Sequence, residues 1–379
     1  MKSKKQNRIA IGIFFFFTGL CFSSWASRIP NIKELFDLNE AELGNLLLVM
    51  PIASVIGLPL SGWIISKFNS RGPLMISFVI YCLSLIGVGF STNLLMLVIS
   101  LTGFSLAIRL INIAINTQAV TLQKKYTKKI NGAFHGYWSL GGIAGLLLAT
   151  LLIKLNVSIE VHLTIVAFLT TLVTGLFYTN LLKNDKPKTG NKIILGKPDL
   201  FVLYLGLIVF FAAICEGGIY DWNGVYFKEV IHTEIFTLGY LSFMICMTIA
   251  RFFSDRVIER IGIEKTFLLS AICIVLGIGT AIVFPVFWPA IIGFCITGFG
   301  IATIFPMAFS LSGESSKYSP GMLISIISTY SIVGMLIGPP LIGYLAYLFN
   351  LQASFFVFVF CGLLFIPLSK LLFKIQKNS

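Results

Sequence analysis

Four polar side chains lie at helical spacing inside one long apolar stretch. Ser105, Arg109, Asn112 and Asn116 are separated by four, three and four residues, so a helix of 3.6 residues per turn carries all of them on one face. The arginine offers a planar fork of N–H donors that fits a carboxylate or a phosphate. The stripe therefore predicts a recognition surface, with the asparagines as neutral hydrogen-bonding neighbours. The alternative is a structural arginine that bonds carbonyls or an acid on another helix.

Two carboxylates lie in a second apolar stretch. Glu216 is followed by Gly217 and Gly218, which weaken a helix locally, so we expect a break that lets backbone groups face a cavity. A charge left in an apolar interior is costly, and a carboxylate there can load and release a proton. Glu216 and Asp221 are therefore candidate proton-coupling residues. Two alternatives stay open: Asp221 as a helix-end charge at the membrane surface, and Glu216 as a fixed structural partner.

The elements that must position these side chains are membrane-spanning helices. Of 379 residues, 57% are hydrophobic and 11% are charged, which is too apolar for a soluble protein with a solvated surface. A helix needs roughly 20 apolar residues to cross about 30 Å of hydrocarbon. We expect spans at 9–27, 41–66, 72–91, 94–121, 131–153, 161–182, 200–225, 235–254, 264–284, 286–311, 320–346 and 351–373.

The two halves of the chain resemble each other. Tyr137, Gly141 and Gly145 recur as Tyr330, Gly334 and Gly338, each 193 residues later. Internal duplication in an apolar chain is typical of a secondary transporter. We expect a six-helix bundle in residues 1–182, a cytoplasmic linker in 183–198 and a second bundle in 199–379.

Three ring side chains are further candidates. Trp25 and Trp222 occupy matched places 197 residues apart, near the outer ends of their helices, where they either stack on a ligand or anchor the membrane interface. His135 begins a span near the cytoplasm and either titrates during coupling or bonds the backbone at the helix end. Arg109 and Glu216 are not expected to meet directly, because their depths along oppositely directed helices differ by roughly 10 to 15 Å at 1.5 Å per residue.

The basic residues fall mostly on one side of the predicted spans. Of the 28 lysines and arginines, the opposite side has only Arg28, Lys33, Lys154 and Lys228, and Arg109 is the single cation at membrane depth. Cytoplasmic flanks collect Lys and Arg, so both termini are expected in the cytoplasm. The net charge of +13 then needs no nucleic-acid partner.

Two short loops carry a second repeated pattern. GWIISKFNSRG begins at Gly62 and RFFSDRVIERIG begins at Arg251, at equivalent places in the two halves. Both resemble the cytoplasmic loop motif of the major facilitator superfamily, in which an acid pairs across a helix interface that opens during transport. The residues that match in this chain, as gating candidates, are Gly62, Lys67, Arg71, Asp255 and Arg256. The first copy has Ser66 in place of the acid, and Asn69 in place of the second glycine.

With the repeat and the twelve spans, the chain resembles this superfamily over nearly its whole length. The resemblance implies an all-α polytopic membrane protein whose twelve transmembrane helices form two pseudo-symmetric six-helix bundles, with the first, fourth, seventh and tenth helices lining a central cavity. Segments beginning at Phe134, Glu216 and Gly298 look like the bacterial branch of YbjJ-type permeases and, more distantly, fucose permeases.

The resulting functional expectation is a proton-driven symporter, not an enzyme. It imports a small polar or anionic metabolite across the bacterial inner membrane, as a monomer in the lipid bilayer and without a metal or another cofactor. Na⁺ in place of protons stays open. The alternatives are a proton-coupled efflux antiporter and, in a different class, a non-transporting receptor on the same fold.

Overall fold

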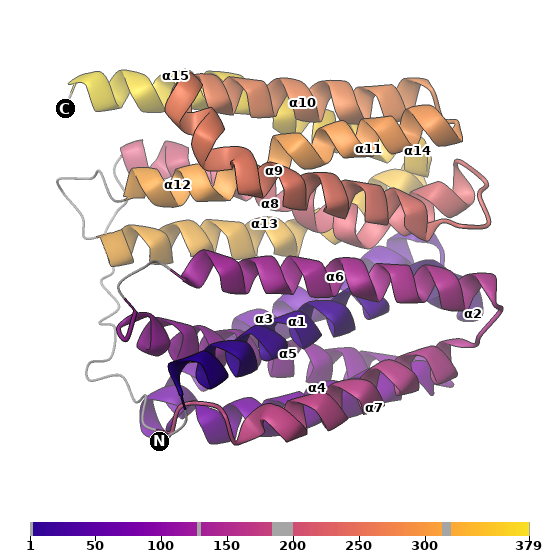
Figure 1. The fold of residues 1–379 in the computed structure, drawn as a ribbon. Helices are drawn as coiled ribbons and strands as arrows, with labels where there is room; N and C mark the ends of the chain where they lie inside the picture. Colours follow the sequence, from indigo (N-terminus) through magenta and orange to yellow (C-terminus); the bar gives the residue numbers. More distant parts are fainter. Residues whose placement is uncertain (1–2, 127–129, 184–199, 313–319, 379) are drawn as a thin grey trace. The chain divides into compact units, whose positions relative to one another are not determined.

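The computed structural model describes residues 3–126, 130–183, 200–312 and 320–378, and the regular structure within these ranges is helical (Figure 1). Twelve helical segments are long and apolar enough to cross a membrane. This confirms the all-α class and the number of predicted spans. Apart from Lys183, the linker predicted at 183–198 lies outside the described residues.

Chain contacts divide the protein into two compact units. The first comprises Met1–Phe36 and Val49–Lys192, and the second comprises Asp37–Leu48 and Ile193–Ser379. The helices of the first are α1 (Lys4–Ala26), α2 (Ile29–Leu35), most of α3 (Glu40–Lys67), α4 (Arg71–Gly89), α5 (Leu94–Gln123), α6 (Asn131–Lys154) and α7 (Ile159–Tyr178). The second holds α8 (Leu200–Glu229), α9 (Thr237–Ile261), α10 (Ile263–Val283), α11 (Phe287–Ala302), α12 (Ile304–Ser312), α13 (Pro320–Leu348), α14 (Leu351–Ser354) and α15 (Phe356–Asn378).

Several helices begin at a polar residue that accepts a hydrogen bond from the first turn. The Asn93 side chain accepts from the Met96 amide at 2.9 Å, and the Asn350 side chain accepts from the Ala353 amide at 2.7 Å. Such caps satisfy amide groups that the helix itself leaves unpaired. Between the caps the residues are overwhelmingly apolar, so a helix is the structure that satisfies their backbone in hydrocarbon.

Glycines bring α1 and α6 close together in the first unit (Figure 1). A methyl group added at Gly141 would collide with the carbonyl oxygen of Phe16, and one at Gly145 would lie 2.6 Å from that of Leu20. One turn earlier, the Tyr137 ring covers Gly12. Small residues of this kind let membrane helices pack backbone to backbone.

The second unit repeats the same contacts between α8 and α13. A methyl group at Gly334 would collide with the carbonyl oxygen of Phe210, one at Gly338 would lie 3.5 Å from that of Ile214, and the Tyr330 ring covers Gly206. The glycines and the carbonyls that they face lie almost the same number of residues further along the chain than their counterparts in the first unit. The sequence repeat therefore corresponds to a repeated helix–helix contact.

The break expected in α8 is absent, and that prediction is wrong. The helix runs without interruption from Leu200 to Glu229, since a glycine pair does not break a helix whose neighbours fill the space above it. Gly217 faces the Met335 side chain, and Gly218 lies under the Phe358 ring. The glycines make room for neighbouring helices instead of opening a cavity.

Candidate functional site

The second unit contains an ion pair inside the predicted membrane region. A guanidinium nitrogen of Arg251, Nη2, donates to Oε1 of Glu216 at 3.0 Å. Glu216 lies in α8 and Arg251 in α9, within the spans Leu200–Glu229 and Thr237–Ser254. The side chain of Glu216 is 8% exposed and that of Arg251 is 31% exposed. The carboxylate is therefore the buried member of the pair, and the guanidinium is its more accessible member.

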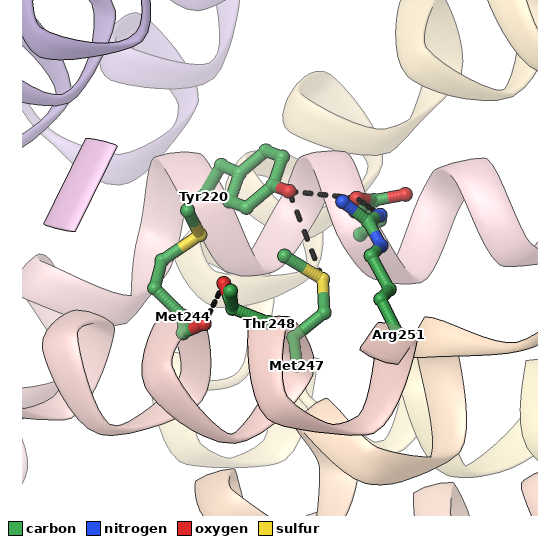
Figure 2. Close-up of polar contacts among 6 residues, drawn as sticks. Tyr220, Met244, Met247, Thr248 and Arg251 are labelled. Atoms are coloured by element: carbon green, nitrogen blue, oxygen red, sulfur yellow. Dashed lines mark hydrogen bonds and ion pairs between the residues drawn. The ribbon is translucent and has the colours of Figure 1, made fainter. Parts of the chain in front are cut away.

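Tyr220 adds a second donor to the same carboxylate oxygen. It follows Glu216 by one helical turn, and its hydroxyl donates to Oε1 at 2.6 Å. Figure 2 shows the Tyr220 ring beside the turn of α9 that carries Met247, whose sulfur lies 3.9 Å from the hydroxyl. The neighbouring Thr248 hydroxyl donates to the Met244 carbonyl of its own helix at 2.7 Å. Two hydrogen bonds thus converge on one oxygen, and apolar side chains surround them.

Arg251 was not predicted as part of a site. Its place near the end of a span predicts a cytoplasmic flanking cation, and Arg109 was expected to be the single cation at membrane depth. The bond to Glu216 gives a second cation within the spans, so that expectation for Arg109 is wrong. The repeat held a usable signal, because Arg251 opens the second loop pattern at the place where the first has Gly62. Within a membrane span, the charged side chain of an arginine needs a hydrogen-bonding or ionic partner that a glycine does not need.

The polar stripe predicted on α5 exists, and its members bond within the first unit. Arg109 donates through Nε to the Ser54 hydroxyl at 2.8 Å and also contacts it through Nη2. Ser105 donates to the Met50 carbonyl, while the Asn116 amide donates to the Asn112 carbonyl of its own helix at 2.7 Å.

Among the described residues, the structure shows no carboxylate paired with Arg109. Its stem packs beside Gly57 of α3, and the side chain is partly exposed. It is therefore a cation held by one neutral hydroxyl, which leaves hydrogen-bonding capacity unused.

The other coupling and stacking candidates are dispersed. The Asp221 side chain is half-buried, and no hydrogen bond or ion pair reaches it from the described residues. Trp25 is 1% exposed and Trp222 is 0% exposed, so both indole rings lie within helix packing. His135 is exposed at the start of α6, where its ring packs edge-on against that of Phe15, with 5.5 Å between the ring centroids.

The gating candidates lie in the last turns of α3 and α9, except for Arg71, which begins α4. Gly62 has no heavy atom within 4 Å of a methyl group built on it. Lys67 lies 4.9 Å from the Trp63 ring, and Arg71 stacks on the Tyr178 ring at 4.3 Å. The Arg256 guanidinium lies 5.7 Å from the Phe253 ring. The side chain of Asp255 lies outside the described part of the chain.

One residue expected at the outer surface is buried instead. Arg28 is 3% exposed, where it donates to Nδ1 of His162 at 3.0 Å and to the Val157 carbonyl at 2.8 Å. Its place just after the first span predicted a flanking cation on the outer side, and the structure shows its partners at the start of α7. Nδ1 of His162 is an acceptor in this bond, so the imidazole is neutral there.

The sequence profile of the Major Facilitator Superfamily matches residues 10–318 and 235–378. The chain belongs to the Major Facilitator Superfamily. This superfamily consists of membrane transporters, so the chain is a transporter and not an enzyme.

Relatives with similar sequences support the assignment. A protein of Yersinia pestis named as an uncharacterized transporter of this superfamily is 30% identical over 355 residues, covering 92% of this chain and 91% of its own length. A Rhizobium meliloti membrane protein named MosC is 28% identical, covering 90% of this chain and 84% of its own length.

Solved superfamily structures share the fold. The nucleoside transporter NupG, as a point variant, aligns over 97% of this chain and 99% of its own with a TM-score of 0.81 at 14% identity. A bacterial homologue of the human lysosomal transporter Spinster aligns over 98% of each chain with a TM-score of 0.75 at 13% identity. Likeness at such low identity concerns the fold alone.

Proposed function

We propose that this transporter is proton-coupled and that Glu216 is the residue that takes up the proton. The observation that carries the proposal is the bond between Glu216 and Arg251 within two membrane spans. A buried ion pair is stabilising only while both charges are present, since either charge alone is costly in a medium of low polarity. Protonation of Glu216 removes one charge and breaks the pair.

This arrangement links a proton to helix packing. Glu216 belongs to α8 and Arg251 to α9, so the pair joins two helices of the same unit. Loss of the bond changes the free energy of the contact between them. A proton that binds one state of this contact more tightly than another shifts the balance between the states.

The transported molecule is proposed to be a small polar or anionic metabolite recognised by Arg109. This guanidinium is always charged and has only Ser54 as a described partner, so an oxyanion can still bind it. We propose import across the bacterial inner membrane by a monomer with both termini in the cytoplasm, in keeping with the distribution of basic residues.

The test uses proteoliposomes in weakly buffered medium. Sugars, organic acids, nucleosides and small peptides are added in turn, and the external pH is recorded for the wild type and for Glu216→Gln. Glu259→Gln is the matched control, because Glu259 is an exposed carboxylate of the same unit on α9.

We expect one substrate class to give a proton signal that Glu216→Gln abolishes and Glu259→Gln preserves. Arg109→Ala should remove the response to anionic solutes. A proton signal that is unchanged in Glu216→Gln, with transport intact, contradicts the coupling role. Proton movement opposite to that expected for import assigns export instead.

A further inference from the structure

We propose that Arg251 is a proton-gated carboxylate site: when Glu216 is protonated, Arg251 exchanges the Glu216 carboxylate for that of a small organic acid. The inference rests on the proposed coupling role of Glu216; it narrows the ligand class to carboxylates and adds Arg251, in the second unit, as an anion-binding residue besides Arg109. The exchange needs no covalent step, because the proton joins Glu216 from solution and the ligand enters as its anion.

The geometry of the ion pair leaves the guanidinium partly accessible. Arg251 bonds Glu216 through Nη2, and Tyr220 donates to the same oxygen, Oε1. Tyr220 also interacts with Arg251 itself. The side chain is 31% exposed, against 8% for its partner. A second carboxylate can therefore approach the arginine from its accessible side, and two parallel N–H donors suit it.

Charge balance gives the reason for the exchange. With Glu216 ionised, the pair is neutral. With Glu216 protonated and the site otherwise empty, Arg251 is an uncompensated cation within a membrane span, which is costly. Binding one carboxylate restores neutrality, so the proton and the anion favour each other, and each must strengthen binding of the other by the same factor.

Among the side chains that the structure describes around Glu216, Arg251 is the counter-charge. The titratable groups beside Glu216 are Tyr220 on its own helix, and Arg251 and Tyr240 on α9. The described parts of α11, α12 and α13 contain no charged residue. On α15, which contacts α8 at Gly218, lysines begin only at Lys370, three turns beyond the contact at Phe358.

The lining of the site favours a small carboxylate. Arg251 already accommodates one carboxylate oxygen at 3.0 Å, and the Tyr220 hydroxyl is a second donor nearby. The adjacent side chains of Phe243, Met244 and Met247 are fully buried and apolar. These groups suit an anionic head with a short organic body.

The internal repeat shows that the fold does not require this arginine. The first loop pattern has Gly62 at the place of Arg251, and nothing lies within 4 Å of a methyl group built there. The glycine contacts between α1 and α6 in the first unit are repeated between α8 and α13 in the second unit. Since the first unit forms without an arginine at the matched position, we assign Arg251 a role in ligand binding in addition to its bond to Glu216.

The experiment measures ligand binding by the purified full-length protein in detergent, without any transport. Lactate, pyruvate and succinate are the carboxylate probes, inorganic phosphate is the other oxyanion, and calorimetric titrations are made at pH 8 and pH 5.5. The variants are Glu216→Gln, Arg251→Gln and, as a matched control, Arg260→Gln, which removes an exposed arginine nine residues further along α9.

For the wild type, we expect at least one carboxylate to bind about tenfold more tightly at pH 5.5 than at pH 8, within the usual range of coupling between sites. Glu216→Gln mimics the protonated state, so it should bind tightly at both pH values, with a difference below about twofold. Arg251→Gln should lose at least about tenfold in affinity at pH 5.5, and Arg260→Gln should behave as the wild type.

Three results overturn the inference: no carboxylate binds, Arg251→Gln binds as tightly as the wild type, or Glu216→Gln keeps the pH dependence. Binding of phosphate alone overturns the ligand class. If Arg251→Gln does not fold, the double variant Glu216→Gln with Arg251→Gln has no unpaired charge, and it must lack the binding that Glu216→Gln shows.

The outcome is separable from that of the proposed function. Proton coupling is judged from flux in proteoliposomes, whereas the carboxylate site is judged from binding in detergent. Coupled flux without binding at Arg251 leaves the proposed function standing and rejects the inference. If binding follows the expected pattern but no added substrate gives a proton flux, the proposed function alone is rejected.

Discussion

Removing the two charges of the ion pair one at a time, and then together, should have very different effects on stability. Arg251→Gln leaves the Glu216 carboxylate, which is 8% exposed, with Tyr220 as its remaining donor. Loss of one partner of a buried pair costs about 3–5 kcal/mol, and the partial exposure of Arg251 places this variant near the lower end, at about 3 kcal/mol.

The reverse substitution should cost less. Glu216→Gln leaves Arg251 as the unpaired charge, and its side chain is less buried, at 31% exposed, so we expect a loss of about 1.5 kcal/mol. The double variant has no unpaired charge and should lose only about 1.5 kcal/mol. The coupling energy of the cycle is then about 3 kcal/mol.

The assay is urea unfolding in dodecyl maltoside micelles, followed by tryptophan fluorescence at pH 7.5 and pH 5. The loss in Arg251→Gln should shrink on acidification, because a protonated Glu216 no longer needs a counter-charge. Additive effects of the two substitutions at pH 7.5 would show that the pair contributes no interaction energy. A loss that is the same at both pH values would refute the argument from buried charge.

Two further predictions concern the first unit. Gly141→Ala should lower the free energy of unfolding by about 1–3 kcal/mol, because the added methyl group collides with the Phe16 carbonyl. The control Gly62→Ala, in open space on α3, should be neutral or stabilise the protein by up to about 1 kcal/mol. Equal losses for the two variants in the same urea assay would contradict the packing argument. Ser54→Ala removes the hydroxyl that accepts a hydrogen bond from Arg109, which is partly exposed. We expect the free energy of substrate binding to weaken by about 1 kcal/mol, so KM for uptake into proteoliposomes should rise about fivefold. An unchanged KM would show that Ser54 does not position the arginine.

The membrane spans and the internal repeat could be predicted because both depend on short-range sequence properties. Runs of apolar residues give the twelve spans, whatever their neighbours are. The glycines spaced with Tyr137 and Tyr330 mark a contact between two particular helices, and the structure places each of them against a backbone carbonyl of the partner helix. The burial of Glu216 also followed from its position in an apolar stretch.

Local sequence was misleading where a neighbouring helix decides the outcome. The glycine pair after Glu216 predicted a break in α8, yet Met335 and Phe358 fill the space and the helix continues. Arg28 was expected on the outer side as a cation flanking the first span, and nothing in the spacing indicated that it would be buried with His162 as a partner. Both outcomes depend on side chains from neighbouring helices.

The sequence by itself determined the class of protein, the number of spans and the acid on α8, since hydropathy and residue spacing suffice for these. Only the tertiary structure decided which cation that acid meets. Glu216 and Arg251 are 35 residues apart and join through the packing of α8 on α9. No periodicity in the sequence predicts this contact, because it depends on how two helices cross and on which counter-charge a long side chain can reach in hydrocarbon.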